Sequence, residues 1–186
     1  MPRVVDAHAQ RVVIARALWR LAAAAGMEAV SLRDVAAEAG VSMGRVQHYF
    51  ATKDEMLLFA WKLAHQRMQQ RIDARIPAGA DAEQTVRAIL QELLGEDPET
   101  REVLLVHLAY SARALSDSRI GAMLTAGDDE IRSLIASAVR TGDPEREAQL
   151  LLLTAERLGT DVALGQRRPD EARELLEYAM TRVFGR

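Results

Sequence analysis

The sequence predicts an all-α protein of about nine helices, in which a small N-terminal three-helix domain precedes a larger helical domain. Alanine and leucine dominate the chain, and strongly β-branched runs are scarce. Apolar residues recur at spacings of three and four, as they do along one face of a helix. Four of the five prolines lie in polar breaks where a helix can begin: Pro77, Pro98, Pro144 and Pro169.

Four helices are expected in the first 75 residues. The first covers about residues 5–25, and the second begins at 31 and ends at a tight turn over 39–41. The third covers 42–48 and the fourth 52–75. Gly26 ends the first, because glycine readily adopts the left-handed conformation found at helix ends. Ser31 begins the second helix, and Asp34 completes an S-x-x-D capping pattern. Ser42 caps the third helix.

Five further helices are expected downstream, at about 81–95, 98–114, 118–140, 144–164 and 169–184. Asp97-Pro98 and Asp143-Pro144 each place an aspartate N-cap before a proline at the first helical position. Gly127 marks a place where the helix over 118–140 could be interrupted. We divide the chain into residues 1–53 and residues 54–186, with the long fourth helix shared by both domains.

Composition excludes several classes of protein. The absence of cysteine excludes disulfide frameworks and thiolate metal sites, and a hydrophobic content of 49% excludes intrinsic disorder. No apolar run approaches the ~20 residues that cross a bilayer. No secretory signal is recognisable, so a cytoplasmic location is expected.

Residues 1–53 carry a net charge of +3 and residues 54–186 carry −6. This asymmetry suits a polyanion-binding N-terminal segment, although a coding bias toward arginine would also produce it.

Residues 31–50 fit a helix-turn-helix. Two short helices cross closely only over small residues and a permissive turn, which Ala36 and Gly40 supply. Their shared apolar core is expected to consist of three valines: Val35, Val41 and Val46. The second helix then offers its outer face to the DNA major groove, where the residues near its N-terminus reach base edges first.

Three residues on that outer face are expected to read bases. Arg45 suits guanine O6 and N7, Gln47 suits adenine N6 and N7, and Met43 suits a thymine methyl group. A second set is better placed for phosphates, which fix the register without reading sequence: Ser31, Arg33, Ser42, His48, Tyr49 and Lys53. Double-stranded DNA is therefore the expected partner.

Several features follow one another along this segment. A helix ends at Gly26, and Ser31 caps the next helix. An A-x-x-A-G-V-S turn at 36–42, an aromatic pair at 49–50 and a Lys-Asp-Glu helix start at 53–55 then follow. Over about residues 8–58 the chain thereby resembles the DNA-binding domain of TetR/AcrR-family transcriptional regulators. The resemblance implies a variable helical ligand-binding domain, a homodimer formed largely by the last two helices, and repression relieved by a small molecule. Many members carry a tyrosine where this chain has Gln47, so Gln47 either reads a base or contacts phosphate.

Two other classes of function are alternatives to a DNA-binding regulator. One is a helical ligand-binding or interaction protein whose helix-turn-helix no longer binds DNA. The other is an enzyme, because residues 40–44 match G-x-S-x-G. A nucleophile elbow needs a strand before its serine, however, and a helix is expected there. Neither His65 nor His107 has a partner at metal-ligand spacing, and the acids at 128–130 suit a helix start. No enzyme activity, cofactor or metal is expected.

The larger domain is expected to bind a small-molecule effector among its amphipathic helices. The candidate residues are aromatic, sulfur-containing or ionisable, and each also suits an ordinary core or surface position: Trp61, His65, Met68, His107, Tyr110, Met123, Glu156 and Asp161. Glu156 and Asp161 lie in the otherwise apolar segment 150–164. A buried carboxylate there needs a partner, and a cationic ligand would serve.

Residues 150–153 and 175–184 carry more apolar surface than one small bundle should expose. Pairing these segments about a two-fold axis would bury that surface and set two recognition helices on successive major-groove faces. The expected operator is therefore a near-palindrome. The long fourth helix is the expected lever through which an effector changes the separation of the two DNA-binding heads.

Overall fold

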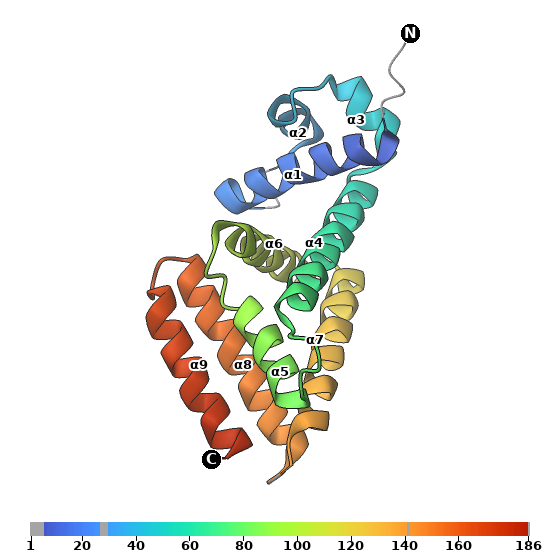
Figure 1. Ribbon diagram of the computed structural model, residues 1–186. Helices are drawn as coiled ribbons and strands as arrows, with labels where there is room; N and C mark the ends of the chain where they lie inside the picture. Colours follow the sequence, from blue (N-terminus) through green and yellow to red (C-terminus); the bar gives the residue numbers. More distant parts are fainter. Residues whose placement is uncertain (1–5, 27–29, 141, 186) are drawn as a thin grey trace. The chain divides into compact units, whose positions relative to one another are not determined.

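The computed structural model describes residues 6–26, 30–140 and 142–185, and within these ranges it contains nine α-helices and no β-strand (Figure 1). The helices are α1 Ala7–Ala25, α2 Leu32–Glu38, α3 Met43–Tyr49, α4 Lys53–Arg75, α5 Ala82–Glu92, α6 Pro98–Ala114, α7 Ser118–Ala138, α8 Pro144–Ala163 and α9 Pro169–Phe184. The all-α prediction is confirmed. The expected start of the first helix near residue 5 lies outside the described residues.

The predicted helix starts are confirmed where aspartate precedes proline. The Asp97 side chain accepts hydrogen bonds at the start of α6, and Asp143 does the same for α8. Two boundaries differ from the prediction. Helix α5 ends at Glu92 rather than near 95, because the chain turns at Gly95, whose φ is +64°. Helix α7 continues through Gly127, so no interruption occurs there.

Contacts within the chain define two compact units that meet inside α4: residues 1–67, the N-terminal unit, and residues 68–186, the C-terminal unit. In the N-terminal unit α1 packs against α2 and α3, which also pack against each other. The core of this unit consists of side chains with no accessible surface: Ile14, Leu18, Trp19, Val35, Val46, Phe50 and Met56. Apolar burial therefore fixes how α1, α2 and α3 cross.

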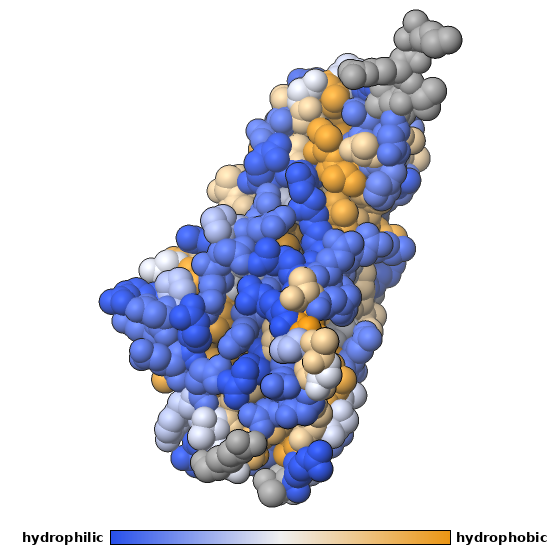
Figure 2. Space-filling view, in the orientation of Figure 1, coloured by the Kyte–Doolittle hydropathy of each residue, from blue (hydrophilic) through white to orange (hydrophobic). Residues whose placement is uncertain are grey.

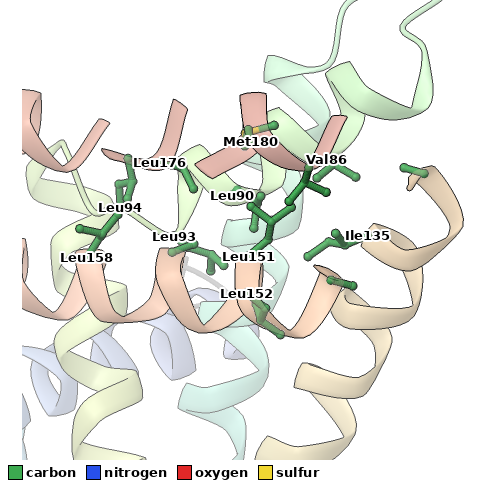
Figure 3. Packing of buried hydrophobic residues seen from close by; sticks show 14 of the residues in the cluster. Val86, Leu90, Leu93, Leu94, Ile135, Leu151, Leu152, Leu158, Leu176 and Met180 are labelled. Carbon is green, nitrogen blue, oxygen red and sulfur yellow. The ribbon is translucent and has the colours of Figure 1, made fainter. Parts of the chain in front are cut away.

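The C-terminal unit is a helical bundle built around α8. Helix α8 packs against α7, α9, α6 and α5, and α5 also packs against α7 and α9. Figure 3 shows the centre of this bundle, where side chains from four helices interlock, among them Leu90, Ile135, Leu151 and Leu176. The closest approach is at Gly159, where an added Cβ would lie 2.0 Å from the Leu93 carbonyl oxygen.

The surface is mainly hydrophilic on the face drawn in Figure 2, with apolar residues interspersed. Within the described ranges, no helix has the length and apolar character needed to cross a membrane. Several large apolar side chains on α8, on α9 and in the turn between them are nevertheless exposed: Leu150, Leu153, Leu164, Leu175 and Tyr178. All five belong to the last two helices or to the turn between them.

Candidate functional site

A reciprocal cap fixes the start of α2. The Ser31 hydroxyl accepts a hydrogen bond from the Asp34 backbone N–H at 3.2 Å, and the Asp34 carboxylate accepts from the Ser31 backbone N–H at 3.0 Å. The same carboxylate accepts from the Ser31 hydroxyl at 2.5 Å. These hydrogen bonds lower the pKa of Asp34. The predicted capping box is therefore present, and the Ser31 hydroxyl already serves the helix.

The turn between α2 and α3 is a Schellman motif. The backbone N–H of Gly40 donates to the Ala37 carbonyl at 3.1 Å, and the backbone N–H of Val41 donates to the Ala36 carbonyl at 3.0 Å. Gly40 has a φ of +65°, the left-handed conformation that the missing side chain permits. Val35 and Ala36 are buried as predicted, whereas Val41 is only half-buried.

Helix α3 buries one side chain of its central turn and exposes the others. Ser42 caps it by accepting from the Arg45 backbone N–H at 3.2 Å, and Val46 is fully buried against the unit. The three predicted base-reading side chains, Met43, Arg45 and Gln47, are all exposed. The helix therefore presents these three side chains to solvent beside its own positive N-terminal end.

The predicted phosphate-contacting residues have different environments. Arg33, Ser42 and His48 are exposed, whereas Tyr49 is half-buried with its ring edge-to-face against His48, 5.1 Å between centroids. Lys53 is also half-buried, and its ammonium donates to the Val30 carbonyl at 2.6 Å. Lys53 thus ties the start of α4 to the segment before α2, a structural role that sequence reasoning missed.

A second connection that sequence reasoning missed centres on Arg11 of α1. Its guanidinium lies 2.9 Å from a carboxylate oxygen of Glu55 and stacks over the rings of Phe50 and Phe59, at 4.5 and 4.6 Å from their centroids. The other Glu55 oxygen accepts from the Ala51 backbone N–H at 2.9 Å. Arg11 therefore holds α1 against the α3–α4 junction. No local motif marks it, because its partners lie 39 or more residues away in the sequence.

The predicted effector-binding residues are divided between the two units. Trp61 is buried and its ring lies 4.4 Å from that of His65, centroid to centroid, and both belong to the N-terminal unit. The other six belong to the C-terminal unit. Tyr110 is buried there, whereas four are half-buried: Met68, His107, Met123 and Glu156.

Glu156 is the most perturbed carboxyl among these candidates. Burial, together with the negative charge of Asp128 on α7, raises the pKa of Glu156 to about 7. Burial also raises the pKa of Asp128, as does its neighbour Asp129. Within the described part of the chain, no hydrogen bond or ion pair reaches the Glu156 carboxylate. Its neighbourhood is therefore short of positive charge.

Asp161, by contrast, already has cationic partners, which corrects the expectation that it needs an external one. Its side chain is 10% exposed and lies 2.8 Å from the Arg157 guanidinium and 3.6 Å from that of Arg167. The sequence spacing of Arg157 and Asp161, i and i+4 on one helix, allows the first pair, whereas the second is not visible in the sequence because Arg167 follows the helix end and returns to it. A requirement for a cation therefore remains only at Glu156.

One pocket of about 360 Å³ lies in the C-terminal unit, between the start of α5 and the end of α9. It is lined mainly by polar residues, and none of the predicted effector-binding residues is among them: Asp81, Glu83, Gln84, Arg87, Thr181, Phe184 and Gly185. This polar pocket, which Glu156 does not line, is not the apolar cavity that was expected.

Two family models match the chain in succession. Residues 14–59 match "Bacterial regulatory proteins, tetR family", and residues 82–185 match "BetI-type transcriptional repressor, C-terminal". A relative in Bacillus subtilis, the HTH-type transcriptional regulator PksA, is 38% identical over 114 residues. That match covers 61% of this chain and 56% of PksA.

Solved structures of regulators have the same fold. A transcriptional regulator from Rhodococcus sp. RHA1 superposes with a TM-score of 0.82 at 29% identity, covering 93% of this chain and 95% of that one. A regulator from Saccharomonospora viridis, described as putative and solved in complex with choline, has a TM-score of 0.75 at 27% identity with the same two coverages, 93% and 95%.

Proposed function

The chain belongs to the TetR family of bacterial regulatory proteins, which are DNA-binding transcriptional regulators and not enzymes, and from that premise we propose a homodimeric repressor released from a near-palindromic operator by a small molecule. The observation that carries the proposal is α3, whose capped N-terminal half exposes Met43, Arg45 and Gln47 while Val46 anchors it. Residues 1–53 are the proposed DNA-binding domain and residues 54–186 the effector-binding and dimerisation domain.

We assign base reading and phosphate contact to different side chains of the N-terminal unit. Arg45 reads guanine, and Met43 contacts a thymine methyl group. The exposed Arg33 and the helix-capping Ser42 contact phosphate and fix the register. Gln47 is exposed one turn further along α3 than Met43, a position that supports a base contact in preference to a phosphate contact.

The exposed apolar group on α8 and α9 is the proposed dimer interface. Leu150 is 60% exposed, Leu153 51% and Tyr178 62%, an unusual concentration for the surface of a monomer. Regulators of this family typically dimerise. A two-fold pairing of α8 and α9 would cover these side chains and make the operator a near-palindrome.

We propose a small organic cation as the effector, bound near Glu156. The support is the charge at that position: Glu156 and Asp128 are two carboxyls that burial disfavours in the ionised form, with no cationic partner for Glu156 among the described residues. A relative of the same fold binds choline. A cation would supply the missing positive charge, and it would favour whichever arrangement of the bundle brings the two carboxyls together.

The experiment that tests the proposed function is selection of a random duplex pool by the purified protein, followed by titration of the enriched duplex at 50 and 200 mM salt. In two heads, Arg33 and Lys53 would neutralise about four phosphates, so affinity should fall about 10²-fold between these salts. The enriched sequence should be a near-palindrome. A protein that enriches no duplex at low salt would instead be a helical ligand-binding or interaction protein.

Such a regulator acts where the chromosome is, so the proposed location is the cytoplasm. No metal or cofactor enters the proposed mechanism. An effector with equal affinity for the DNA-binding and DNA-releasing arrangements would not change their populations. The cation must therefore bind the DNA-releasing arrangement more tightly.

A further inference from the structure

Gly44 is the second residue of α3, a helix of only seven residues. A glycine inside a helix weakens it, because glycine loses more backbone freedom on folding than any other residue and adds no side chain to the packing. A short helix has few other residues to offset that loss. The presence of glycine at this position therefore calls for a physical reason.

Backbone conformation does not supply the reason. Seven glycines of the described chain have a positive φ, a region that residues with a side chain rarely adopt, and Gly44 is not among them. Gly40, in the turn before α3, is one of the seven, at +65°. Gly44 lies inside α3, where the backbone is right-handed helical. Alanine would adopt the same conformation more readily.

Packing within the chain does not supply the reason either. At Gly159 an added Cβ would lie 2.0 Å from a backbone oxygen, so the fold itself excludes a side chain there. At Gly121 an added Cβ would make ordinary contacts at 3.9 Å. At Gly44 it would meet nothing within 4 Å in the described chain beyond its own turn of α3. Gly44 is exposed, and the space beside it is open.

Gly44 lies on the side of α3 that points away from the core. The fully buried Val46 marks the inner side of the helix. Successive helical residues are rotated by about 100°, so Gly44 lies about 160° around the helix from Val46. Arg45 and Gln47 lie about 100° from Val46, one on each side. Gly44 therefore occupies the outermost line of α3, between the two side chains assigned to guanine and adenine.

The dimensions of the DNA major groove give that position its importance. The groove is about 12 Å wide, and an α-helix with its side chains is about 10–12 Å across, so the fit leaves little spare room. The N-terminal part of a recognition helix lies closest to the base edges. His48 shares the outermost line but lies one turn further along α3, where a phosphate contact is assigned to it. A side chain at position 44 would meet the groove floor first.

We propose that Gly44 is a specificity-determining position for operator binding, because the missing side chain lets α3 lie deep enough in the major groove for Arg45 and Gln47 to reach base edges. The inference rests on the proposed function, since it concerns the same DNA-binding surface. Gly44 acts as a positioning residue through its two neighbours. Glycine commonly occurs where a backbone must approach a ligand closely, and here the ligand is the duplex.

The first test measures stability and affinity together in the full-length Gly44→Ala variant. Alanine is the better helix former and meets no neighbouring atom, so the midpoint of thermal unfolding should stay level or rise by up to about 4 °C. Affinity for the enriched duplex should nevertheless fall at least about 25-fold, the effect of one mismatched base pair in each of two half-sites. A residue that serves only the fold cannot produce these two opposite changes.

The second test measures sequence preference. Binding of Gly44→Ala to a random duplex should change by less than about threefold, because phosphates remain within reach when the helix lies higher in the groove. A new selection with this variant should enrich duplexes that have lost the preference at the positions read by Arg45 and Gln47. Gly44→Gln, which adds a longer side chain of good helix propensity, should lose affinity for the enriched duplex at least as strongly.

Gly121→Ala is the matched control, because it makes the same chemical change inside a helix of the C-terminal unit. It should bind the enriched duplex as the unaltered protein does. Binding of Gly44→Ala within about threefold of the unaltered protein would overturn the inference and leave the proposed function intact. A lower unfolding midpoint with equal losses on both duplexes would also overturn it, by assigning Gly44 to folding. Enrichment of no duplex by the unaltered protein would overturn the proposed function first, and the inference with it.

Discussion

The N-terminal and C-terminal units place their polar groups by different means. In the N-terminal unit the recognition elements are held by hydrogen bonds between near neighbours, such as Ser31 with Asp34 and Ser42 with Arg45. In the C-terminal unit the polar groups that join helices pair over long separations, as Arg71 does with Glu92 and Arg87 does with Glu177. The caps of the recognition elements are thus encoded locally, whereas the links between helices depend on distant residues in both units, as Arg11 with Glu55 shows for the N-terminal unit. An operator-reading surface must keep one shape, whereas an effector-responsive bundle must have two.

The largest expected effect is a loss of stability in the C-terminal unit, caused by a substitution that leaves the contacts within the N-terminal unit unchanged. Gly159→Ala would place a Cβ 2.0 Å from the Leu93 carbonyl oxygen, so α5 and α8 must separate. We expect a loss of about 3 kcal/mol or more in the free energy of unfolding, measured by urea denaturation. Gly121→Ala is the control, because the nearest atoms to its added Cβ lie at 3.9 Å. That variant should be unchanged or up to about 1 kcal/mol more stable. An equal loss at both positions would refute the packing argument.

The second prediction concerns DNA binding by the N-terminal unit and leaves the bundle unchanged. Arg45→Ala should weaken binding to the enriched duplex by about 1–3 kcal/mol and relax the preference at one base position. Arg33→Ala should weaken all duplexes alike and reduce the salt dependence, as expected for a phosphate contact. Titration of a small panel of single-base duplexes distinguishes the two. A uniform loss for Arg45→Ala would assign Arg45 to the phosphates.

The third prediction tests the acidic interior of the bundle. The folded-state pKa of Glu156 is about 7, against an ordinary 4.5, so the folded protein binds more protons than the unfolded chain between these values. Stability should therefore fall as pH rises from about 4.5 to 7, and stay level above that range. Glu156→Gln should remove this fall and gain on the order of 1–2 kcal/mol at pH 8, after allowance for solvent screening, with little change at pH 4.

Urea denaturation at pH 4 and pH 8 measures the effect of Glu156→Gln. The exposed Glu174→Gln on α9 is the control and should follow the unaltered protein at both pH values. A Glu156→Gln variant that retains the full pH dependence would show that other groups cause it. The half-buried Glu156 carboxyl would then no longer support a cationic effector.

The smallest expected effects compare local encoding in the two units. Ser31→Ala and Asp81→Ala each remove the N-cap of a complete capping box, on α2 and α5 respectively. Each should cost about 1 kcal/mol in the free energy of unfolding. Equal losses would show that caps contribute alike in both units, so that the difference between the units lies in the long-range pairs. A negligible loss for one of them would locate the difference in the caps themselves.

The sequence predicted what short-range chemistry determines. The all-α fold, the Asp97 and Asp143 helix starts and the capping box at Ser31 were all read from neighbouring residues. The exposure of Arg45 and burial of Val46 follow from helical spacing alone. The roles of the predicted DNA-contacting and effector-binding residues themselves stay predictions.

What the sequence could not predict depends on long-range geometry. Arg11 finds Glu55 and two phenylalanine rings on another helix, and Arg167 returns to Asp161 past the end of α8. Many arginines are available to many acids, and composition does not choose among the pairs. The same ambiguity hid the pairs that Arg71 and Arg75 form with Glu92 and Asp97.

Both tryptophans of the chain, Trp19 and Trp61, belong to the N-terminal unit, and Trp19 is completely buried beneath the Arg67 guanidinium. Intrinsic indole emission therefore reports on the N-terminal unit, while far-ultraviolet circular dichroism sums over the helices of both units. Recorded together during one thermal scan, the two signals give the order in which the units lose structure, with no dye attached and no residue replaced. Coincident curves would indicate one cooperative molecule, and separated curves would indicate two melting steps.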